Sequence, residues 1–308
     1  MKKIAICMAI VMLMLSGCSA RKAENRSMDA MGVTVEFSVW GKDKIAAADA
    51  VEVLISEMEY RWSSASINSI PSKLNDDGPV LYMEDINFLD QLDALTKRTN
   101  GTFDYMMHSV IDLWGFVKGN YQVPSEQALA QALTEEKWNV DAVMKGYTGR
   151  RVAQLLQTMN VDRGIVQLGG NVQTFGENKK GEPWNISIAN PAGGDPICAV
   201  SVYGTMAVVT VGGYQQCFEE NGKRYHHILD PNTGMPADSG LASVTVICED
   251  GVVADVISRA MYVMGLEAAI EFWQGSEDFE AVFVLEDGSI HATQGAKISG
   301  CEYETIAR

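Results

Sequence analysis

Hydrophobic residues change their spacing along this chain, and this change constrains the fold more than any other feature. Between Val33 and Trp40 apolar and polar residues alternate, which predicts a strand with one buried face. From Ile45 to about Tyr60 the apolar residues recur every three or four positions, which predicts a helix. Similar patterns predict helices over residues 86–98, 151–159, 252–264 and 267–273, and strands over 164–168, 184–189, 199–203, 206–210, 242–247 and 281–285. Elements mixed in this order favour an α+β fold over a doubly wound sheet.

Composition supports a single folded unit and excludes one class of partner. The 308 residues are 47% apolar and 21% charged, which is enough to bury a large core without disulfides or metal ions. The chain has no internal repeat and no low-complexity run, and everything after Met31 is expected to form one continuous domain. The formal net charge is −16, and such an acidic chain repels phosphate backbones. We therefore expect no nucleic-acid partner.

The N-terminus has the pattern of an export signal. Lys2 and Lys3 precede an apolar run over residues 4–15, which is too short for a permanent membrane span, and small residues follow it. The sequence that ends at Cys18 resembles the lipobox of bacterial lipoproteins, in which the cysteine is acylated and becomes the first mature residue. The resemblance predicts a signal peptide over residues 1–17, a lipidated tether over 18–30 and a folded domain over 31–308, anchored outside a membrane. The alternative is an ordinary signal peptide in which this cysteine has no role.

Four cysteines remain if Cys7 is removed with the signal and Cys18 is acylated. They are Cys198, Cys217, Cys248 and Cys301. Disulfides are permitted in an exported chain, but no pair has CxxC or metal-finger spacing. Free thiols and bridges are equally compatible with the sequence.

Two of the four histidines stand beside a turn motif. His226 and His227 precede the sequence Asp230-Pro231-Asn232-Thr233-Gly234. Pro and Gly fix the backbone of such a turn and hold the preceding side chains at a set angle. A neutral imidazole here could act as a base or stack on an aromatic ligand. The alternative is a structural histidine with satisfied hydrogen bonds.

Three shorter features have both a functional and a structural interpretation. Gly169-Gly170-Asn171 follows a predicted strand and could let a ligand approach backbone amides, although paired glycines also form ordinary tight turns. Phe103-Asp104 and the Leu-Trp-Gly-Phe sequence at 113–116 fit a helix that packs into the core. Asp255 lies at the start of the predicted helix 252–264, where a carboxylate would serve as a cap.

Taken together and in this order, ten blocks of the chain resemble the ApbE family of flavin transferases. The resemblance runs from Met31 to about Gly265, and the His-x-x-Asp-Pro-x-Thr-Gly segment is its most specific part. The blocks are Met31-Gly32, Arg61-Trp62-Ser63-Ser64, residues 69–75, Phe103-Asp104, Leu113-Trp114-Gly115-Phe116, Lys145-Gly146-Tyr147, Gly169-Gly170-Asn171, residues 225–236, residues 242–246 and Ala254-Asp255.

The resemblance implies a T-fold-like α+β domain of mixed sheets and packed helices that binds FAD and cuts its pyrophosphate. FMN would pass to a Thr or Ser hydroxyl of an acceptor protein in the membrane or exported compartment, and AMP would leave. In the family a divalent metal, usually magnesium, bridges the pyrophosphate oxygens. The resemblance implies catalytic roles for His227 and Asp255, and metal ligation by Asp255 and by the carbonyl of Thr148. It implies FAD binding by Met31, Trp62, Ser63, Asp104, Lys145, Gly146, Gly169, Gly170, Asn171, His227, Asp230 and Thr233.

Two positions depart from the family pattern in the same direction. Arg150 stands where the family has an Asp, and Arg259 stands where it has a metal-binding Thr, one helical turn after Asp255. We expect both arginines to point into the site and to hold the FAD pyrophosphate in place of a dication, unless they turn outward to solvent. The leading hypothesis is a transferase that moves FMN from FAD to a protein. The alternative is a flavin-binding lipoprotein of the same fold that has lost metal-dependent transfer.

Overall fold

The computed structural model describes residues 22–76, 78 and 81–308 of the chain. The expected signal peptide and Cys18 lie outside these residues. The centre of the fold is a nine-stranded sheet in which neighbouring strands are antiparallel, except for the parallel pair at one edge. In spatial order the strands are β1 (Glu24–Ala30), β2 (Val33–Gly41), β3 (Val161–Leu168), β4 (Asn171–Phe175), β7 (Ala207–Gly212), β10 (Leu241–Cys248), β11 (Glu280–Leu285), β12 (Ile290–Thr293) and β14 (Glu304–Ile306).

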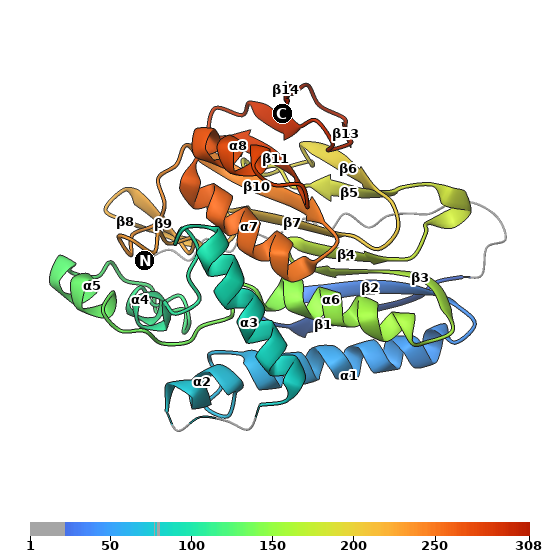
Figure 1. Ribbon diagram of the computed structural model, residues 1–308, viewed down its shortest axis with the longest axis horizontal. Coiled ribbons are helices and arrows are strands. Elements are labelled where there is room, and N and C mark those ends of the chain that lie inside the picture. Colours follow the sequence, from blue (N-terminus) through green and yellow to red (C-terminus); the bar gives the residue numbers. More distant parts are fainter. Residues whose placement is uncertain (1–21, 77, 79–80) are drawn as a thin grey trace.

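Helices cover one face of this sheet. Figure 1 shows α1, α6 and α7 lying across the strands, with α3 crossing over α6 and α7. The remaining helices extend this layer at its ends. The helices are α1 (Lys44–Trp62), α2 (Ile70–Asn75), α3 (Met83–Arg98), α4 (His108–Leu113), α5 (Glu126–Ala132), α6 (Met144–Gln157), α7 (Gly251–Met264) and α8 (Leu266–Gln274).

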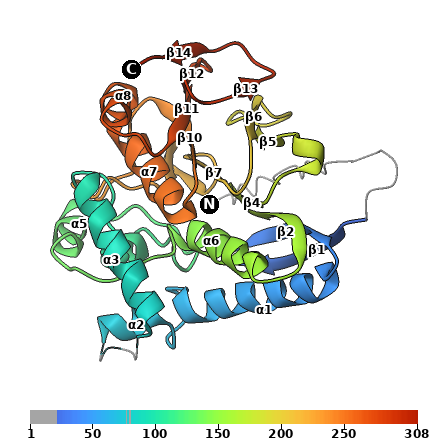
Figure 2. The same ribbon diagram turned by 45° about the vertical axis from the view of Figure 1, so that its right-hand side comes forward.

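A smaller sheet covers the opposite face. It contains β5 (Trp184–Ile188), β6 (Cys198–Val202) and β13 (Ile298–Ser299), and Figure 2 shows it on the side away from the helices. Successive residues of β7 point to opposite faces, so Val209 packs in the core beneath α7 while Val208 packs against the small sheet. A hairpin of β8 (Cys217–Glu220) and β9 (Lys223–His226) leads into the turn motif.

The predicted α+β class is confirmed, and so are the strand at β2 and the helix at α1. Helix α6 differs from the prediction, because it begins at Met144 and not near Arg151. The turns that were not predicted contain Gly146 and Gly149. Glycine has a low helix propensity and adds nothing to the hydrophobic pattern, so nothing in the sequence indicated a helix there. The contacts that these glycines make with neighbouring elements stabilise the helix instead.

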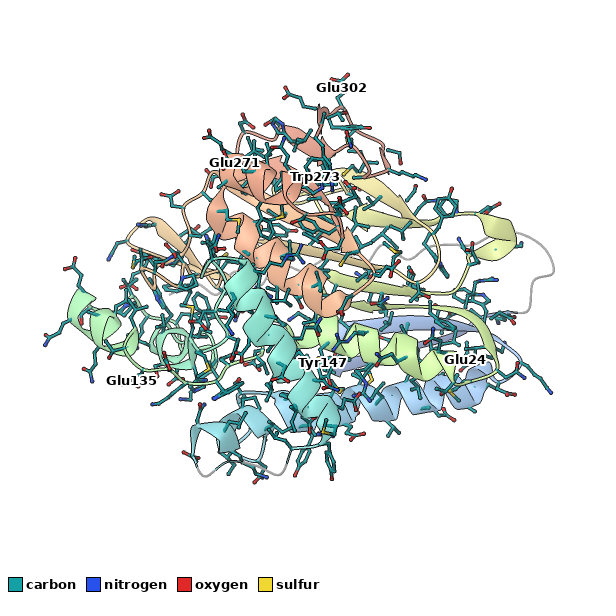
Figure 3. The ribbon with its side chains drawn as sticks, in the orientation of Figure 1. Glu24, Glu135, Tyr147, Glu271, Trp273 and Glu302 are labelled. Atoms are coloured by element: carbon teal, nitrogen blue, oxygen red, sulfur yellow. The ribbon has the colours of Figure 1, made fainter. Side chains whose placement is uncertain are left out.

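The expected tether over residues 18–30 is wrong in its second half. Glu24 to Ala30 form β1, which pairs with β2 along its whole length and carries Glu24 at the end labelled in Figure 3. The strand alternates between half-buried and exposed residues, but most of its side chains are polar, so hydrophobicity gave no signal. Met31 and Gly32, with φ of 53° and 72°, form the tight turn to β2.

Candidate functional site

Two glycines bring α6 and α7 into backbone contact. A Cβ atom on Gly146 would lie 2.1 Å from the carbonyl oxygen of Gly251, and one on Gly251 would lie 2.3 Å from the carbonyl oxygen of Gly146. Side-chain carbons do not approach backbone oxygens this closely, so only glycine fits at either position. The contact places the fourth residue after Gly251, Asp255, directly beside the first turn of α6.

Asp255 is fully buried at this helix contact and is held by two donors. Its Oδ2 accepts hydrogen bonds from the Gly146 N–H at 3.0 Å and from Asn171 Nδ2 at 2.8 Å. Its Oδ1 accepts no hydrogen bond from any described residue, and Arg259 Nε lies 3.6 Å away. A buried polar atom without a hydrogen bond is uncommon because it loses its hydration without compensation. Asp255 Oδ1 is therefore a candidate functional atom.

Arg259 lies one helical turn after Asp255 and links it to the turn motif. Its Nε donates to the carbonyl oxygen of Ala142 at 2.9 Å, and its Nη1 lies 3.4 Å from His227 Nε2. The side chain is only 11% exposed. One guanidinium thus contacts the loop before α6, the carboxylate on α7 and the histidine after β9.

The contacts of His227 define its tautomer. Arginine has donors and no acceptor, so the contact with Arg259 requires that His227 Nε2 carry the lone pair. The proton is then on Nδ1, which donates to the carbonyl oxygen of Gln216 at 3.3 Å. Burial holds the pKa of His227 well below its ordinary value of 6.5, and the charge of Arg259 lowers the pKa further. His227 is therefore a neutral imidazole at physiological pH.

This pKa shift predicts a pH dependence of stability. Below pH 6.5 the unfolded chain binds a proton at His227 that the folded chain does not. The free energy of unfolding therefore decreases as the pH is lowered, until the pH reaches the folded-state pKa of His227. We expect urea denaturation between pH 7 and pH 5 to show a smaller loss of stability in His227→Gln than in the wild type. Equal losses in the two proteins would contradict the neutral, buried state.

Two further charged residues extend this cluster. Lys145 interacts with it through its charge, and Asp141 interacts with Lys145 in the same way. The family blocks contain Lys145 but not Asp141. Burial lowers the pKa of Lys145, while Asp255 opposes this shift and Arg259 adds to it. Burial raises the pKa of Asp141, although its Oδ1 accepts a hydrogen bond from the Ser64 N–H at 2.9 Å. Asp141 was not predicted, and its position four residues before Lys145 was the only signal in the sequence.

The glycine pair at the β3–β4 turn positions Asn171. Gly169 has a φ of 62°, and a Cβ atom on Gly170 would lie 2.4 Å from the carbonyl oxygen of Thr210. The turn therefore packs tightly against β7 and directs the Asn171 amide to Asp255. In the described structure the role of this segment is to hold Asn171 in place.

The turn motif after His227 is braced by its own side chains. Asp230 Oδ1 accepts from the Asn232 N–H at 2.9 Å, and Asp230 Oδ2 accepts from Thr233 Oγ1 at 3.3 Å. The carbonyl oxygen of Gly234 accepts from Trp114 Nε1 at 2.8 Å. Asp230 and Thr233 therefore shape the turn, and its rigidity fixes the direction of His227.

Arg150 does not join the cluster, which corrects the expectation that both arginines point into it. Its Nη1 donates to Gln91 Oε1 at 2.7 Å and to Asp250 Oδ2 at 2.8 Å. Asp250 is the N-cap of α7 and accepts from the Val252 N–H, so the capping role suggested for Asp255 is also wrong. Arg150 faces Asp250 because it lies one turn beyond Gly146 on α6, opposite the start of α7.

Trp62 is a core residue, and its expected role in FAD binding stays a prediction. Its ring is 1% exposed and meets the rings of Phe88 and Tyr147 edge-on. Figure 3 labels Tyr147 where α3 crosses α6, and the guanidinium of Arg150 lies 5.0 Å from the centre of that ring. Trp62 therefore packs inside this aromatic cluster.

Four other expected site residues make local contacts. The Met31 N–H donates to Glu59 Oε1 at 2.7 Å, and Thr148 Oγ1 lies 3.6 Å from Met31 Sδ. Ser63 is the C-cap of α1, and its N–H donates to the carbonyl oxygen of Glu59. Asp104 Oδ1 accepts a hydrogen bond from the Met106 N–H at 2.7 Å. Among the described residues, none of the four side chains has a hydrogen bond or ion pair with Asp255, His227 or Arg259.

Two cavities lie away from this cluster. One of about 640 Å³ lies between β6, the end of β10 and the loop before β11, and another of about 210 Å³ is lined by Tyr147 and Arg150. Neither is lined by Asp255, His227 or Arg259. Asp255, His227 and Arg259 remain the candidate site because of their mutual contacts.

The donors of the cluster do not fit a divalent cation. Magnesium prefers several oxygen ligands in octahedral geometry, but Asp255 offers one oxygen that faces a guanidinium. Within the described part of the chain, no three His, Cys, Asp or Glu side chains are grouped so that they could hold a metal ion. Arg259 and Lys145 would also repel a dication. The expected ligation by Asp255 and Thr148 is therefore not supported.

The fold and this site define a class of protein that has been solved several times. The ApbE protein of Thermotoga maritima matches with a TM-score of 0.81 and 28% identity, over 89% of this chain and 97% of that protein. The flavin transferase ApbE of Vibrio cholerae matches with a TM-score of 0.75 over 90% of this chain and 98% of that protein. At 22% identity the second match shows the fold alone.

Sequence comparison identifies the family. The ApbE family profile matches residues 31–283, and the chain belongs to this family. A relative from Haemophilus influenzae named FAD:protein FMN transferase is 28% identical, over 87% of this chain and 88% of its own length. A Treponema pallidum protein with the same name is 27% identical, over 81% of this chain and 80% of its own length.

Proposed function

We propose that this protein is an FAD:protein FMN transferase, which moves FMN from FAD to a Thr or Ser hydroxyl of an acceptor protein and releases AMP. The observation that carries the proposal is that Asn171 binds the buried carboxylate of Asp255, that Arg259 links this carboxylate to His227, and that Lys145 lies close enough to interact with its charge. These residues come from four separate segments of a chain that belongs to a family with transferase members.

The cluster offers the groups that this reaction requires. The acceptor oxygen attacks the FMN phosphorus, the bond from that phosphorus to the bridging oxygen breaks, and AMP leaves with the bridging oxygen. The cationic side chains of Lys145 and Arg259 can stabilise the charge that develops on the phosphate oxygens. His227 Nε2 carries a lone pair that can accept the hydroxyl proton once the Arg259 donor moves away.

The test of this proposal is transfer to a defined peptide. The purified domain is incubated with FAD and an acceptor peptide that contains one Thr, and with a control peptide that has Val at that position. Transfer requires that the Thr peptide gain the mass of FMN less one water molecule and that an equal amount of AMP appear. FAD binding without either product would exclude transferase activity toward that acceptor.

A second candidate function is flavin binding without transfer. One observation favours it, namely that the Asp255 cluster does not fit the divalent cation that metal-dependent phosphoryl transfer uses. In that case FAD would bind intact, and no AMP would be released in the presence or absence of magnesium.

We also propose that the protein is an exported lipoprotein that meets its acceptor at a membrane. The lipobox-like sequence that ends at Cys18 supports the proposal. No helix of the described residues is long and apolar enough to cross a bilayer. We expect Cys18→Ala to leave the protein as an unprocessed precursor or in the soluble fraction. The matched control is Cys7→Ala, which changes a cysteine inside the apolar run and should leave processing intact. A Cys18→Ala protein that is processed and is recovered with the membrane as fully as the control would contradict the anchor.

A further inference from the structure

We propose that Arg259 is the resident cation of this site and binds the pyrophosphate of FAD directly, so that FAD binds without a divalent metal. The inference rests on the proposed function for the identity of the anion. It assigns to one side chain both the recognition of the phosphates and the control of the neighbouring base.

The guanidinium is held in a fixed position by groups from three segments. Ala142 accepts the Nε–H at 2.9 Å, His227 Nε2 lies 3.4 Å from Nη1, and Asp255 Oδ1 lies 3.6 Å from Nε. Only 11% of the Arg259 side chain is exposed to solvent. Such a group keeps its charge and loses little further entropy when it binds an anion.

One end of the guanidinium is free for a ligand. The Nη2 atom has no hydrogen-bond acceptor among the described residues, whereas Nε and Nη1 each have a contact. A phosphate oxygen at Nη2 would gain a charge-assisted hydrogen bond, and a second oxygen could bond to Nη1 in the bidentate arrangement that arginine favours. Nη2, together with Nη1 once it leaves His227, therefore matches two oxygens of a phosphate group.

The contact with His227 gives this binding a second effect. At 3.4 Å the Nη1 to Nε2 separation exceeds the usual range of about 2.7–3.2 Å, so the bond is weak and easily exchanged. When Nη1 turns to a phosphate oxygen, His227 Nε2 loses its donor and its lone pair becomes available to the acceptor hydroxyl. Arg259 thus keeps the base occupied until the substrate is bound.

The decisive experiment is calorimetric titration of FAD in EDTA and in magnesium. The wild type is expected to bind FAD with affinities that agree within about twofold in the two buffers. Arg259→Thr should bind FAD roughly 10- to 100-fold more weakly in EDTA because one charge-assisted pair of hydrogen bonds is lost. Arg259→Lys keeps the charge but not the two parallel donors, and it should fall between the two.

Two controls separate a local effect from misfolding. Arg26→Thr removes a guanidinium on β1, far from the cluster along the sheet, and it should bind FAD as the wild type does. Thermal melting of each variant gives the fraction folded, which corrects the measured affinity. Magnesium alone is also titrated into each protein. Only Arg259→Thr is expected to release heat on binding magnesium, because loss of the guanidinium uncovers Asp255 Oδ1.

Each outcome bears on a different proposal. Wild-type FAD binding that is lost in EDTA, with Arg259→Thr unchanged, would overturn the role of Arg259 and leave the transferase proposal standing. Metal-independent binding that requires Arg259, without transfer to the Thr peptide, would support the inference and reject transfer. No FAD binding in either buffer would overturn both.

Discussion

Asp255→Ala is expected to abolish measurable FMN transfer, with a rate at least roughly 10³-fold below that of the wild type. Asp255 Oδ2 fixes the Gly146 N–H and the Asn171 amide, and Oδ1 faces the guanidinium of Arg259. Without the carboxylate, the Gly146 N–H, the Asn171 amide and the Arg259 guanidinium lose their common partner. AMP release under saturating FAD, measured by chromatography, gives the rate.

The same substitution should also destabilise the fold. It leaves Arg259 as a buried cation without its carboxylate, and the loss of one partner of such a pair costs about 3–5 kcal/mol. Asp255→Asn keeps the shape of the side chain and separates the two effects, since it retains an oxygen for Gly146 or Asn171 but removes the charge. Urea denaturation measures stability, and the rates are compared at a temperature where each variant is folded. A rate within a few fold of the wild type in either variant would contradict the central role of Asp255.

Gly146→Ala is expected to lower the free energy of unfolding by more than about 3 kcal/mol, at the upper end of the overpacking range. The new Cβ atom would lie 2.1 Å from the Gly251 carbonyl oxygen and 3.0 Å from Asp255 Cβ. The Gly251 carbonyl group and the Asp255 Cβ atom both belong to α7 and cannot move aside independently, so α6 and α7 must separate to accept one methyl group. Chemical denaturation monitored by circular dichroism measures the change.

Gly149→Ala is the matched control in the same helix. Its Cβ atom would lie 3.1 Å from the Cβ atom of Gln173, so β4 needs to shift by only a few tenths of an ångström. The substitution also removes a glycine from a helix interior, which favours folding by up to about 1 kcal/mol. We therefore expect little change or a small gain in stability. Equal losses in Gly146→Ala and Gly149→Ala would show that the α6–α7 contact does not limit the packing.

Periodicity predicted those elements in which one face is apolar and the other polar. The strand at β2 and the helices α1 and α7 were found close to their observed bounds because burial alone determines their patterns. Strand β1 was missed because its pairing with β2 uses polar residues. The first turns of α6 were missed because their stability depends on contacts with α7 and β4 that no local pattern records.

The site was predictable in its residue types and less so in its contacts. The family blocks named His227, Asn171, Lys145 and Asp255, which the fold brings together. They gave Arg150 and Arg259 the same expected role, yet the two side chains diverge. Arg150 reaches Gln91 on α3 and the N-cap Asp250, and the place of α3 over α6 depends on tertiary packing alone.

Strand β1 limits how far the protein can reach from a membrane. If Cys18 carries the lipid, only residues 19–23 separate the anchor from the first residue of the sheet. A chain of this length spans at most about 20 Å, including the bonds at its ends. The start of β1 would then lie within this distance of the bilayer surface. An acceptor hydroxyl farther from the membrane than the domain itself extends would be out of reach. With such an anchor, the short tether would restrict the protein to acceptors whose hydroxyl lies near the membrane.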